Sequence, residues 1–172
     1  MNETLYRVSA NPHVRDKSST QSIMLDVILA LLPATVFGIY IFGASAAVTI
    51  AVSIVTCVAA EYIYQKLMKQ KVSVSDLSAA VTGLLLALNL PAGVPFWMPV
   101  LGGLFAIIVV KQVFGGLGQN FMNPALGARC FLMISFAARM TTFTYDGVTT
   151  ATPLALLKAG KSVDLGNVFT GF

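Results

Sequence analysis

Charged side chains are scarce in this chain of 172 residues: only 10% are Asp, Glu, Lys or Arg, while 56% are hydrophobic. Soluble globular domains carry about 25% charged residues, so the composition excludes an ordinary soluble domain. Apolar windows that approach the roughly 20 residues needed to cross a bilayer as a helix recur along the chain. The sequence therefore predicts an integral membrane protein, an all-α polytopic bundle of about five transmembrane helices.

Residues that bind metals or form disulfides are also few. The single histidine, His13, lies in the polar N-terminal segment, and the two cysteines, Cys57 and Cys130, lie inside apolar segments. The sequence has no CxxC pair and no histidine cluster, so it gives no signal of a metal site. A free thiol in an apolar helix behaves as a small hydrophobe, and we expect both cysteines to serve in packing.

The polar and apolar segments divide the chain into three parts and suggest an orientation. Residues 1–23 form a basic arm, residues 24–138 hold the apolar segments, and residues 139–172 form a further segment. The expected spans are 24–42, 46–64, 77–90, 98–111 and 124–138. Lys66, Lys69 and Lys71 follow two crossings after the basic arm, so both basic clusters predict a cytoplasmic N-terminus. We therefore attribute the net charge of +4 to basic clusters that set the orientation of the chain in the bilayer. We expect no nucleic acid as a partner.

Two regions depart from a simple row of spans. The segment 77–90 is short for a crossing, and it is compatible with a tilted helix, a re-entrant half, or a helix that continues as extended chain through Pro91 and Pro95. Residues 112–123 contain three glycines and two asparagines. Irregular backbone at membrane depth is tolerated only where protein or a cavity satisfies it, so both regions are expected to border buried or wet sites.

Arg129 lies inside the fifth expected span. An arginine at the centre of an isolated membrane helix costs on the order of 2.5–3.5 kcal/mol on insertion scales, which favours a position facing the bundle interior or a wet cavity. The alternative is a side chain that extends to the nearby basic side of the membrane. The residues alone leave both positions open.

The stretch 146–154 carries several hydroxyl groups and ends in Thr152, Pro153 and a leucine. Local chemistry predicts a helix start, because a threonine oxygen accepts an unpaired backbone N–H at an N-cap and proline is suited to the first turn. Counting the spans places this stretch, together with Arg139, on the extracytoplasmic side. The simplest interpretation of these residues is a capped helix.

Four stretches in this order carry a family resemblance: 11–15, 83–91, 114–129 and 146–154. Together they resemble the D subunit of Rnf complexes, which are ion-translocating ferredoxin:NAD oxidoreductases, and more distantly the B subunit of the sodium-pumping NADH:quinone oxidoreductase. The resemblance implies a subunit of the bacterial or archaeal cytoplasmic membrane that passes electrons in a chain coupled to Na⁺ or H⁺ transport. It also implies other membrane and peripheral Rnf subunits as partners, in addition to the lipid bilayer.

The resemblance further implies an FMN joined through its phosphate to a threonine, in the motif Asp-Gly-x-[Ser/Thr]-Gly-Ala-Thr. Asp146 and Gly147 open this motif, Thr149 takes the Ser/Thr position, and Thr152 is the acceptor. Thr150 stands where glycine is usual, which restricts the backbone and makes Thr150 the fallback acceptor. A flavin transferase is then the implied partner for maturation.

The flavin hypothesis assigns roles to charged and polar residues elsewhere in the chain. A phosphate attached to Thr152 would lie at a helix N-terminus, where backbone N–H groups favour an anion. Arg139, and Lys158 or Lys161, are candidates to neutralise its charge, and Arg129 is a candidate cofactor-binding residue. Whether a second, non-covalent flavin binds near Asn120 and Asn123 stays open.

Members of the resembled family are roughly twice as long, with a second set of spans related to the first as an inverted repeat. We therefore expect a fragment or a split subunit, whose fold is half of that architecture. Two other functions stay open. The short third segment, the Gly/Asn-rich region and Arg129 are compatible with half of a small-solute transporter or channel without a redox cofactor. A purely structural assembly subunit that has lost the cofactor is the remaining possibility.

Overall fold

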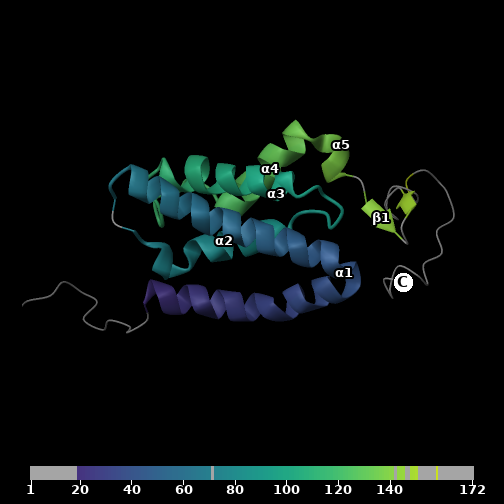
Figure 1. The fold of residues 1–172 in the computed structure, drawn as a ribbon, viewed down its shortest axis with the longest axis horizontal. Coiled ribbons are helices and arrows are strands. Elements are labelled where there is room, and N and C mark those ends of the chain that lie inside the picture. Colours follow the sequence, from purple (N-terminus) through teal and green to yellow (C-terminus); the bar gives the residue numbers. More distant parts are fainter. Residues whose placement is uncertain (1–18, 71, 142, 146–147, 151–157, 159–172) are drawn as a thin grey trace, which may run out of the picture.

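The computed structural model describes residues 19–70, 72–141, 143–145, 148–150 and 158, and most of them form helices (Figure 1). The elements in chain order are the helix α1 (Thr20–Leu67), the short 3₁₀ helix η1 (Val74–Asp76), α2 (Ser78–Leu88), α3 (Trp97–Leu104), the π-helix η2 (Phe105–Gln112), α4 (Pro124–Ser135) and α5 (Ala137–Met140). Two short strands, β1 (Phe143–Tyr145) and β2 (Val148–Thr150), follow α5 and pair in antiparallel fashion. The prediction of a helical bundle is confirmed, and the hairpin is a feature that the sequence did not predict.

Helix α1 consists of two helices that fold back on each other at Gly43 (Figure 1). Gly43 has φ 68° and ψ −154°, a region that is essentially restricted to glycine. Ser19 caps the start of α1 by accepting the backbone N–H of Ser22. Pro33 lies within the first half without a break in helical backbone angles, because the only non-helical residue inside α1 is Gly43. The reversal at Gly43 thus falls between the expected spans 24–42 and 46–64.

The second half of α1 presents a stripe of small or polar side chains, one every four residues, to the rest of the bundle. Its members are Ser45, Thr49, Ser53, Cys57, Glu61 and Gln65, and all except Ser45 are buried. Residues four apart lie on one helix face. Small residues on such a face let helix backbones approach closely, and Ser53 Oγ donates a hydrogen bond of 2.8 Å to the carbonyl oxygen of Gly83 in α2.

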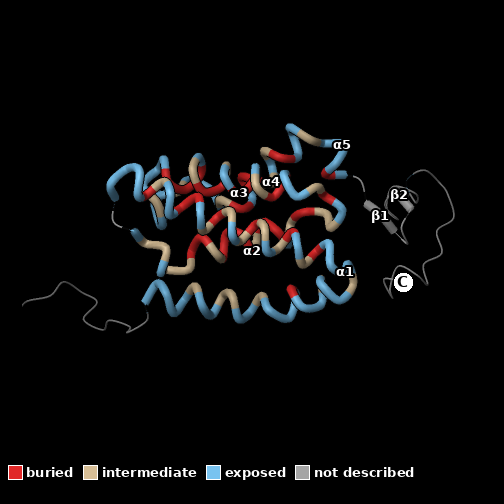
Figure 2. The backbone as a smooth tube through the Cα atoms, in the orientation of Figure 1, coloured by how far each residue is buried: buried red, intermediate tan, exposed pale blue. Residues whose placement is uncertain are grey.

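The main apolar core lies between α2, α3 and α4, where Leu86, Met98, Ala128 and Leu132 are buried (Figure 2). The rings of Phe105 and Phe131 stack beside this core at 4.3 Å between centroids. A smaller cluster around Cys57 joins α1, α2 and η2. Packing is thus confirmed for Cys57, whereas the same expectation is wrong for Cys130, which is exposed on α4.

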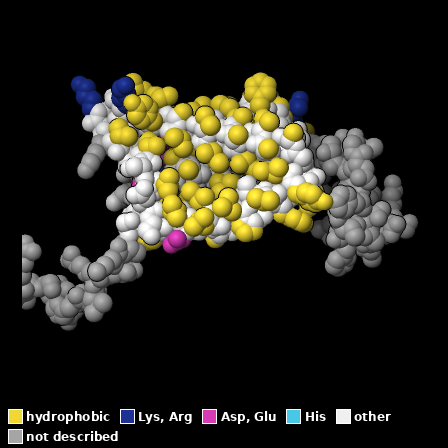
Figure 3. Space-filling model, turned by 60° about the horizontal axis from the view of Figure 1, so that its bottom comes forward, with side chains coloured by type: hydrophobic (Ala, Val, Ile, Leu, Met, Phe, Trp, Pro, Cys, Tyr) yellow, Lys and Arg dark blue, Asp and Glu magenta, His cyan; other side chains and the backbone are white. Residues whose placement is uncertain are grey.

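The first half of α1 is mostly exposed, with Thr35 as its buried residue (Figure 2). Hydrophobic side chains cover the face of the molecule seen from that side, and the charged side chains in this view lie toward its edges (Figure 3). An apolar surface of this kind suits lipid as the surrounding solvent. By length and composition, α1 is the one described helix that qualifies for crossing a membrane, and three shorter apolar helices accompany it.

The expected spans correspond closely to the observed helices, with differences at two places. The third segment forms the helix α2 of 11 residues, followed by turns through Pro91 and Pro95. At 1.5 Å per residue α2 extends about 16 Å, against about 30 Å for the hydrocarbon core. Of the alternatives for this segment, the structure has a short helix followed by non-helical chain through Pro91 and Pro95, although this chain forms turns and is not extended. The fifth segment is divided at Phe136, where φ is −134° and ψ is 46°, into α4 and α5.

Candidate functional site

A cavity of about 310 Å³ lies at the end of the bundle where α1 reverses direction. Residues of both halves of α1, including Gly38, Phe42 and Thr49, line it together with residues 87–92, Arg129 and Met140. Its volume lies at the lower end of the roughly 300–1,000 Å³ that small-molecule pockets occupy. The cavity is therefore the first candidate for a ligand or cofactor site in the described part of the chain.

Arg129 projects from α4 into the bundle interior. Its Nη1 donates a hydrogen bond of 2.9 Å to Asn89 Oδ1, and the residue lines the cavity. Of the two positions left open by the sequence, the structure has the interior one, because Asn89 and the cavity lie at the end opposite to the start of α4. A guanidinium has five N–H donors, so Arg129 has donors beyond the one that Asn89 uses.

The irregular backbone after α2 forms one wall of the same cavity. Ser45 Oγ donates to the carbonyl oxygen of Ala92, and Asn89 Nδ2 donates to the carbonyl oxygen of Leu85 at 2.7 Å. Non-helical backbone at membrane depth needs such partners or a wet cavity. The irregular chain that follows the short third helix thus forms a wall of the cavity.

The stretch 146–152, in which the resemblance implies a flavin attachment, lies only partly within the described residues. Thr149 and Thr150 belong to β2, where Thr149 is paired with Thr144 and Thr150 with Phe143. Extended backbone suits β-branched residues, so threonine in place of glycine at position 150 agrees with a strand. Asp146, Gly147 and the expected acceptor Thr152 lie outside the described residues, and so does Lys161. Arg139 is exposed on α5, and Lys158 is exposed and helical.

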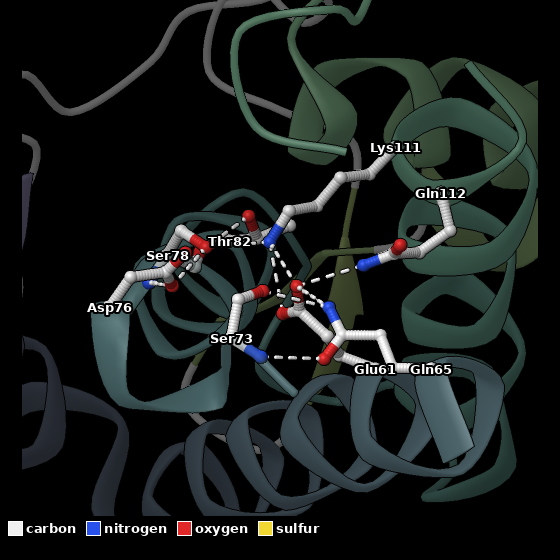
Figure 4. Close-up of polar contacts among 8 residues, drawn as sticks. All are labelled: Glu61, Gln65, Ser73, Asp76, Ser78, Thr82, Lys111 and Gln112. Atoms are coloured by element: carbon white, nitrogen blue, oxygen red, sulfur yellow. Dashed lines mark hydrogen bonds and ion pairs between the residues drawn. The ribbon is translucent and has the colours of Figure 1, made fainter. Parts of the chain in front are cut away.

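A second polar site lies at the other end of the bundle and centres on Glu61 (Figure 4). Lys111 Nζ lies 2.9 Å from both carboxylate oxygens of Glu61, and both residues are only 1% exposed. Lys111 Nζ also donates to Ser78 Oγ at 2.6 Å, and Gln112 Nε2 donates to Glu61 Oε1 at 2.8 Å. This ion pair joins the second half of α1 to η2 across 50 residues of sequence.

Neighbouring polar groups complete the network around Glu61. Gln65 Nε2 donates to Glu61 Oε1 at 3.2 Å and to Ser73 Oγ at 2.8 Å, and Gln65 Oε1 accepts the backbone N–H of Ser73 at 2.9 Å. Asp76 Oδ1 accepts both the backbone N–H and the hydroxyl of Ser78. Removing a partner from a buried ion pair is strongly destabilising, whereas the intact pair adds little net stability. A buried, paired charge between apolar helices makes these residues a candidate functional site.

A small cavity of about 120 Å³ lies beside this ion pair. Lys111 and Ser78 line it from one side, and Asn120 and Asn123 line it from the loop before α4. Within the described part of the chain, Asn120 Oδ1 is a buried side-chain oxygen that has no hydrogen-bond partner. Asn123 instead caps α4 by accepting the backbone N–H of Ala125 at 3.0 Å, with Pro124 in the first turn.

The ion pair was not among the residues predicted from the sequence. Two signals were available: Glu61 is the only acidic residue in the expected span 46–64, and Lys111 is the last residue of the expected span 98–111. Each was compatible with an interfacial position. A charged residue inside an apolar helix calls for a partner, but the sequence does not identify which of the lysines provides it.

Comparisons with known proteins show the family to which the chain belongs. The model of the NQR2, RnfD, RnfE family matches residues 7–172. The chain is 52% identical, over 99% of its length, to the D subunit of the Na⁺-translocating ferredoxin:NAD⁺ oxidoreductase complex of Acetobacterium woodii, of which it covers 56%. It is 42% identical over 98% of its length to the D subunit of the proton-translocating ferredoxin:NAD⁺ oxidoreductase complex of Clostridium ljungdahlii, of which it covers 53%. It is 41% identical over 96% of its length to the D subunit of the ion-translocating oxidoreductase complex of Yersinia enterocolitica, of which it covers 46%. The chain thus spans about half the length of the curated relatives it matches.

Proposed function

Because the chain belongs to the NQR2, RnfD, RnfE family, we propose that it acts as a membrane subunit, or part of one, in an ion-translocating ferredoxin:NAD⁺ oxidoreductase complex. The observation that carries the proposal is the match over residues 7–172, a range that includes residues 146–152. Relatives named for Na⁺ and for proton translocation are both similar to the chain. The coupling ion is therefore Na⁺ or H⁺, and other subunits of the complex are the partners.

The cofactor in this proposal is an FMN joined through its phosphate to Thr152. When bound, the flavin supplies the electron-transfer chemistry, while the protein supplies binding, orientation and electrostatics. The position of α5 supports the assignment: α5 ends at Met140, which lines the Arg129 cavity, and β1 begins three residues later. The motif is thus tethered to the end of the bundle that holds this cavity.

The residues at that end have the chemistry that a phosphorylated flavin requires. Arg129 has guanidinium donors beyond the one that binds Asn89, and an arginine can bind a phosphate or a ring carbonyl through two parallel hydrogen bonds. Arg139 is exposed and lies 13 positions before Thr152, where its charge is available to a phosphate. We assign Arg129 to cofactor orientation and Arg139 to charge neutralisation, with Thr150 as the fallback acceptor.

The proposal also includes a second, non-covalent flavin near Asn120 and Asn123. The unpartnered Asn120 Oδ1 in the 120 Å³ cavity favours a ligand with a hydrogen-bond donor. The cavity is smaller than typical ligand pockets of about 300 Å³ and more, so the loop before α4 has to move for a whole flavin to enter.

The expected orientation places the N-terminus and the Lys66 and Lys69 end in the cytoplasm, with the flavin motif outside. Both lysines are exposed and lie at the end of α1, while the Gly43 turn and the start of the hairpin lie at the opposite end (Figure 1). Positive residues accumulate on the cytoplasmic side of membrane proteins. We therefore propose a multi-pass protein of the bacterial or archaeal cytoplasmic membrane.

A second candidate function is half of a small-solute transporter or channel without a redox cofactor. The 310 Å³ cavity beside irregular backbone is the observation in its favour, because transporters place substrate sites where membrane helices are interrupted. The two candidates differ in one property that is simple to measure, which is a covalently bound flavin.

The test is fluorescence of the denatured chain in a gel under ultraviolet light, after co-expression with a flavin transferase. We expect a fluorescent band for the wild-type chain and for Thr150→Ala, and no band for Thr152→Ala at equal protein loading. Fluorescence that persists in Thr152→Ala and disappears in Thr150→Ala would move the attachment to the fallback residue. A wild-type chain that never fluoresces would refute the covalent flavin and favour the transporter or the cofactor-free assembly subunit.

A further inference from the structure

The helix that carries Lys111 ends in an unusual backbone register. Residues 105–112 form a π-helix of eight residues, and hydrogen bonds between residues five apart continue to its end, from Val113 N to the Ile108 oxygen at 3.1 Å and from Gly116 N to the Lys111 oxygen at 3.0 Å. π-helices are rare, usually confined to a single turn, and frequent at functional sites. An eight-residue π-helix therefore requires a cause.

The local sequence does not provide that cause. The segment Phe-Ala-Ile-Ile-Val-Val-Lys-Gln contains neither proline nor glycine, the residues that usually disturb a helix. Within residues 105–112, the cause that we consider is therefore the contacts that the segment makes.

The two residues at the end of η2 bind the same carboxylate. Lys111 Nζ contacts both oxygens of Glu61 at 2.9 Å, and Gln112 Nε2 donates to Glu61 Oε1 at 2.8 Å. Successive side chains of an α-helix point about 100° apart, whereas a wider turn reduces this angle. The π register thus brings two consecutive side chains toward one buried acceptor.

We propose that Glu61 is a latch that holds residues 105–112 in the π register, and that loss of its charge pairing with Lys111 returns the segment to the α register. Loss of the π register rotates the end of the helix about its axis. The rotation is roughly the 100° that separates neighbouring residues. Lys111 then points away from Glu61, and the loop at 113–123 leaves the helix in a different direction.

The small cavity beside the ion pair changes with the register. Lys111 forms one part of its wall, and Asn120, with its unpartnered oxygen, forms another on the loop that follows η2. A rotation of the helix end moves both. The latch therefore couples the charge state of one buried carboxylate on α1 to the shape of a cavity whose wall includes Lys111 and Asn120, whichever ligand that cavity takes.

Disulfide formation between η2 and α4 reports the register directly. A Cβ built on Gly127 lies 3.3 Å from Val110 Cγ2, so in the π register a cysteine sulfur in the place of that Cγ2 would lie next to the Cβ of a cysteine at position 127. We therefore use the pair Val110→Cys and Gly127→Cys as the disulfide probe. The nearest atom to that Cβ is Met122 Sδ at 2.8 Å, on a flexible side chain that can move aside. Cys57→Ala and Cys130→Ala remove the native thiols.

A matched control uses a native cysteine before the π-helix. A Cβ on Gly103 lies 3.2 Å from Cys57 Sγ, so Gly103→Cys with Cys57, in a Cys130→Ala background, reports the packing of α3 on α1. Both pairs are measured in the full chain in native membranes after mild oxidation. The readout is the fraction of chain whose thiols escape a polyethylene-glycol maleimide after denaturation.

The decisive variant is Glu61→Gln with Lys111→Met, which removes both charges at nearly constant volume and leaves no unpaired buried ion. We expect the 110–127 cross-linking rate to fall at least tenfold while the 103–57 rate stays within twofold, and the exchanged pair Glu61→Lys with Lys111→Glu to restore the 110–127 rate. An unchanged 110–127 rate in the charge-free variant overturns the latch, because packing then holds the register. A parallel fall of both rates also overturns it, because the ion pair then holds the bundle as a whole.

Discussion

Helix backbones approach closely at Gly83, where α2 crosses the second half of α1, and this contact supports a quantitative prediction. A Cβ built on Gly83 lies 2.7 Å from Ile54 Cα, 2.9 Å from the Ser53 oxygen and 3.0 Å from Ile54 N. All three are backbone atoms, so no side chain can rotate to make room. Ordinary contact begins near 3.4 Å, and the difference 3.4 − 2.7 requires the two helices to separate by about 0.7 Å.

We expect Gly83→Ala to destabilise the bundle by about 1–3 kcal/mol, the usual effect of overpacking a close-packed interior. The separation also lengthens the 2.8 Å hydrogen bond from Ser53 Oγ to the Gly83 oxygen, and such bonds contribute about 0.6 kcal/mol on average between membrane helices. Ser53→Ala alone should therefore cost clearly less than Gly83→Ala.

The assay is the free energy of unfolding of the purified chain in mixed micelles, followed by circular dichroism as denaturing detergent is added. Gly38→Ala is the matched control, because a Cβ on Gly38 meets no atom within 4 Å and alanine favours a helix over glycine by about 1 kcal/mol. The reasoning is refuted if Gly83→Ala is as stable as the wild-type chain, since the two backbones then approach less closely than the structure shows.

Three further substitutions test other parts of the structure. Gly43→Ala places a side chain at φ 68° and ψ −154°, so we expect a loss of about 1–3 kcal/mol in the same unfolding assay, and no loss would show that the turn can rearrange. Glu61→Gln leaves Lys111 buried without its counter-charge, and we expect a loss of about 3–5 kcal/mol, most of which Lys111→Met recovers in the double variant; a double variant no more stable than the single would contradict the pairing. Asp146→Cys, in a chain without native cysteines, should react with a membrane-impermeant thiol reagent on intact cells, and labelling that requires permeabilised cells would reverse the proposed orientation.

The positions of the helices could be predicted from the sequence because each apolar window reflects a local requirement. About 20 apolar residues are needed to cross a bilayer, and the breaks between windows carry residues with clear backbone preferences. Gly43 marks the reversal within α1, and Asn123 with Pro124 marks the start of α4. The end of α2 near Asn89 was also visible, since the following Pro91 does not continue a helix.

The arrangement around Arg129 could be predicted only in part. The cost of placing an arginine in a membrane helix is an argument for the bundle interior, but the residues alone left open a side chain that extends to the basic side. The partner Asn89 lies 40 positions away, and no local rule selects it. The flavin motif stays a prediction of sequence and resemblance, because Asp146, Gly147 and Thr152 lie outside the described residues. The hairpin that contains Thr149 and Thr150 was missed, since its strands are too short to give an alternating pattern.

The π register of residues 105–112 illustrates what a sequence pattern leaves out. The apolar run from Met98 to Lys111 predicts a helix correctly, because both α- and π-helices satisfy the backbone within the segment, as a membrane requires. The choice between them depends on the position of Glu61, which another helix fixes through the buried stripe of α1. Register is therefore a property of the packed pair of helices, and the same sequence would adopt the narrower turn wherever the carboxylate is absent or neutralised.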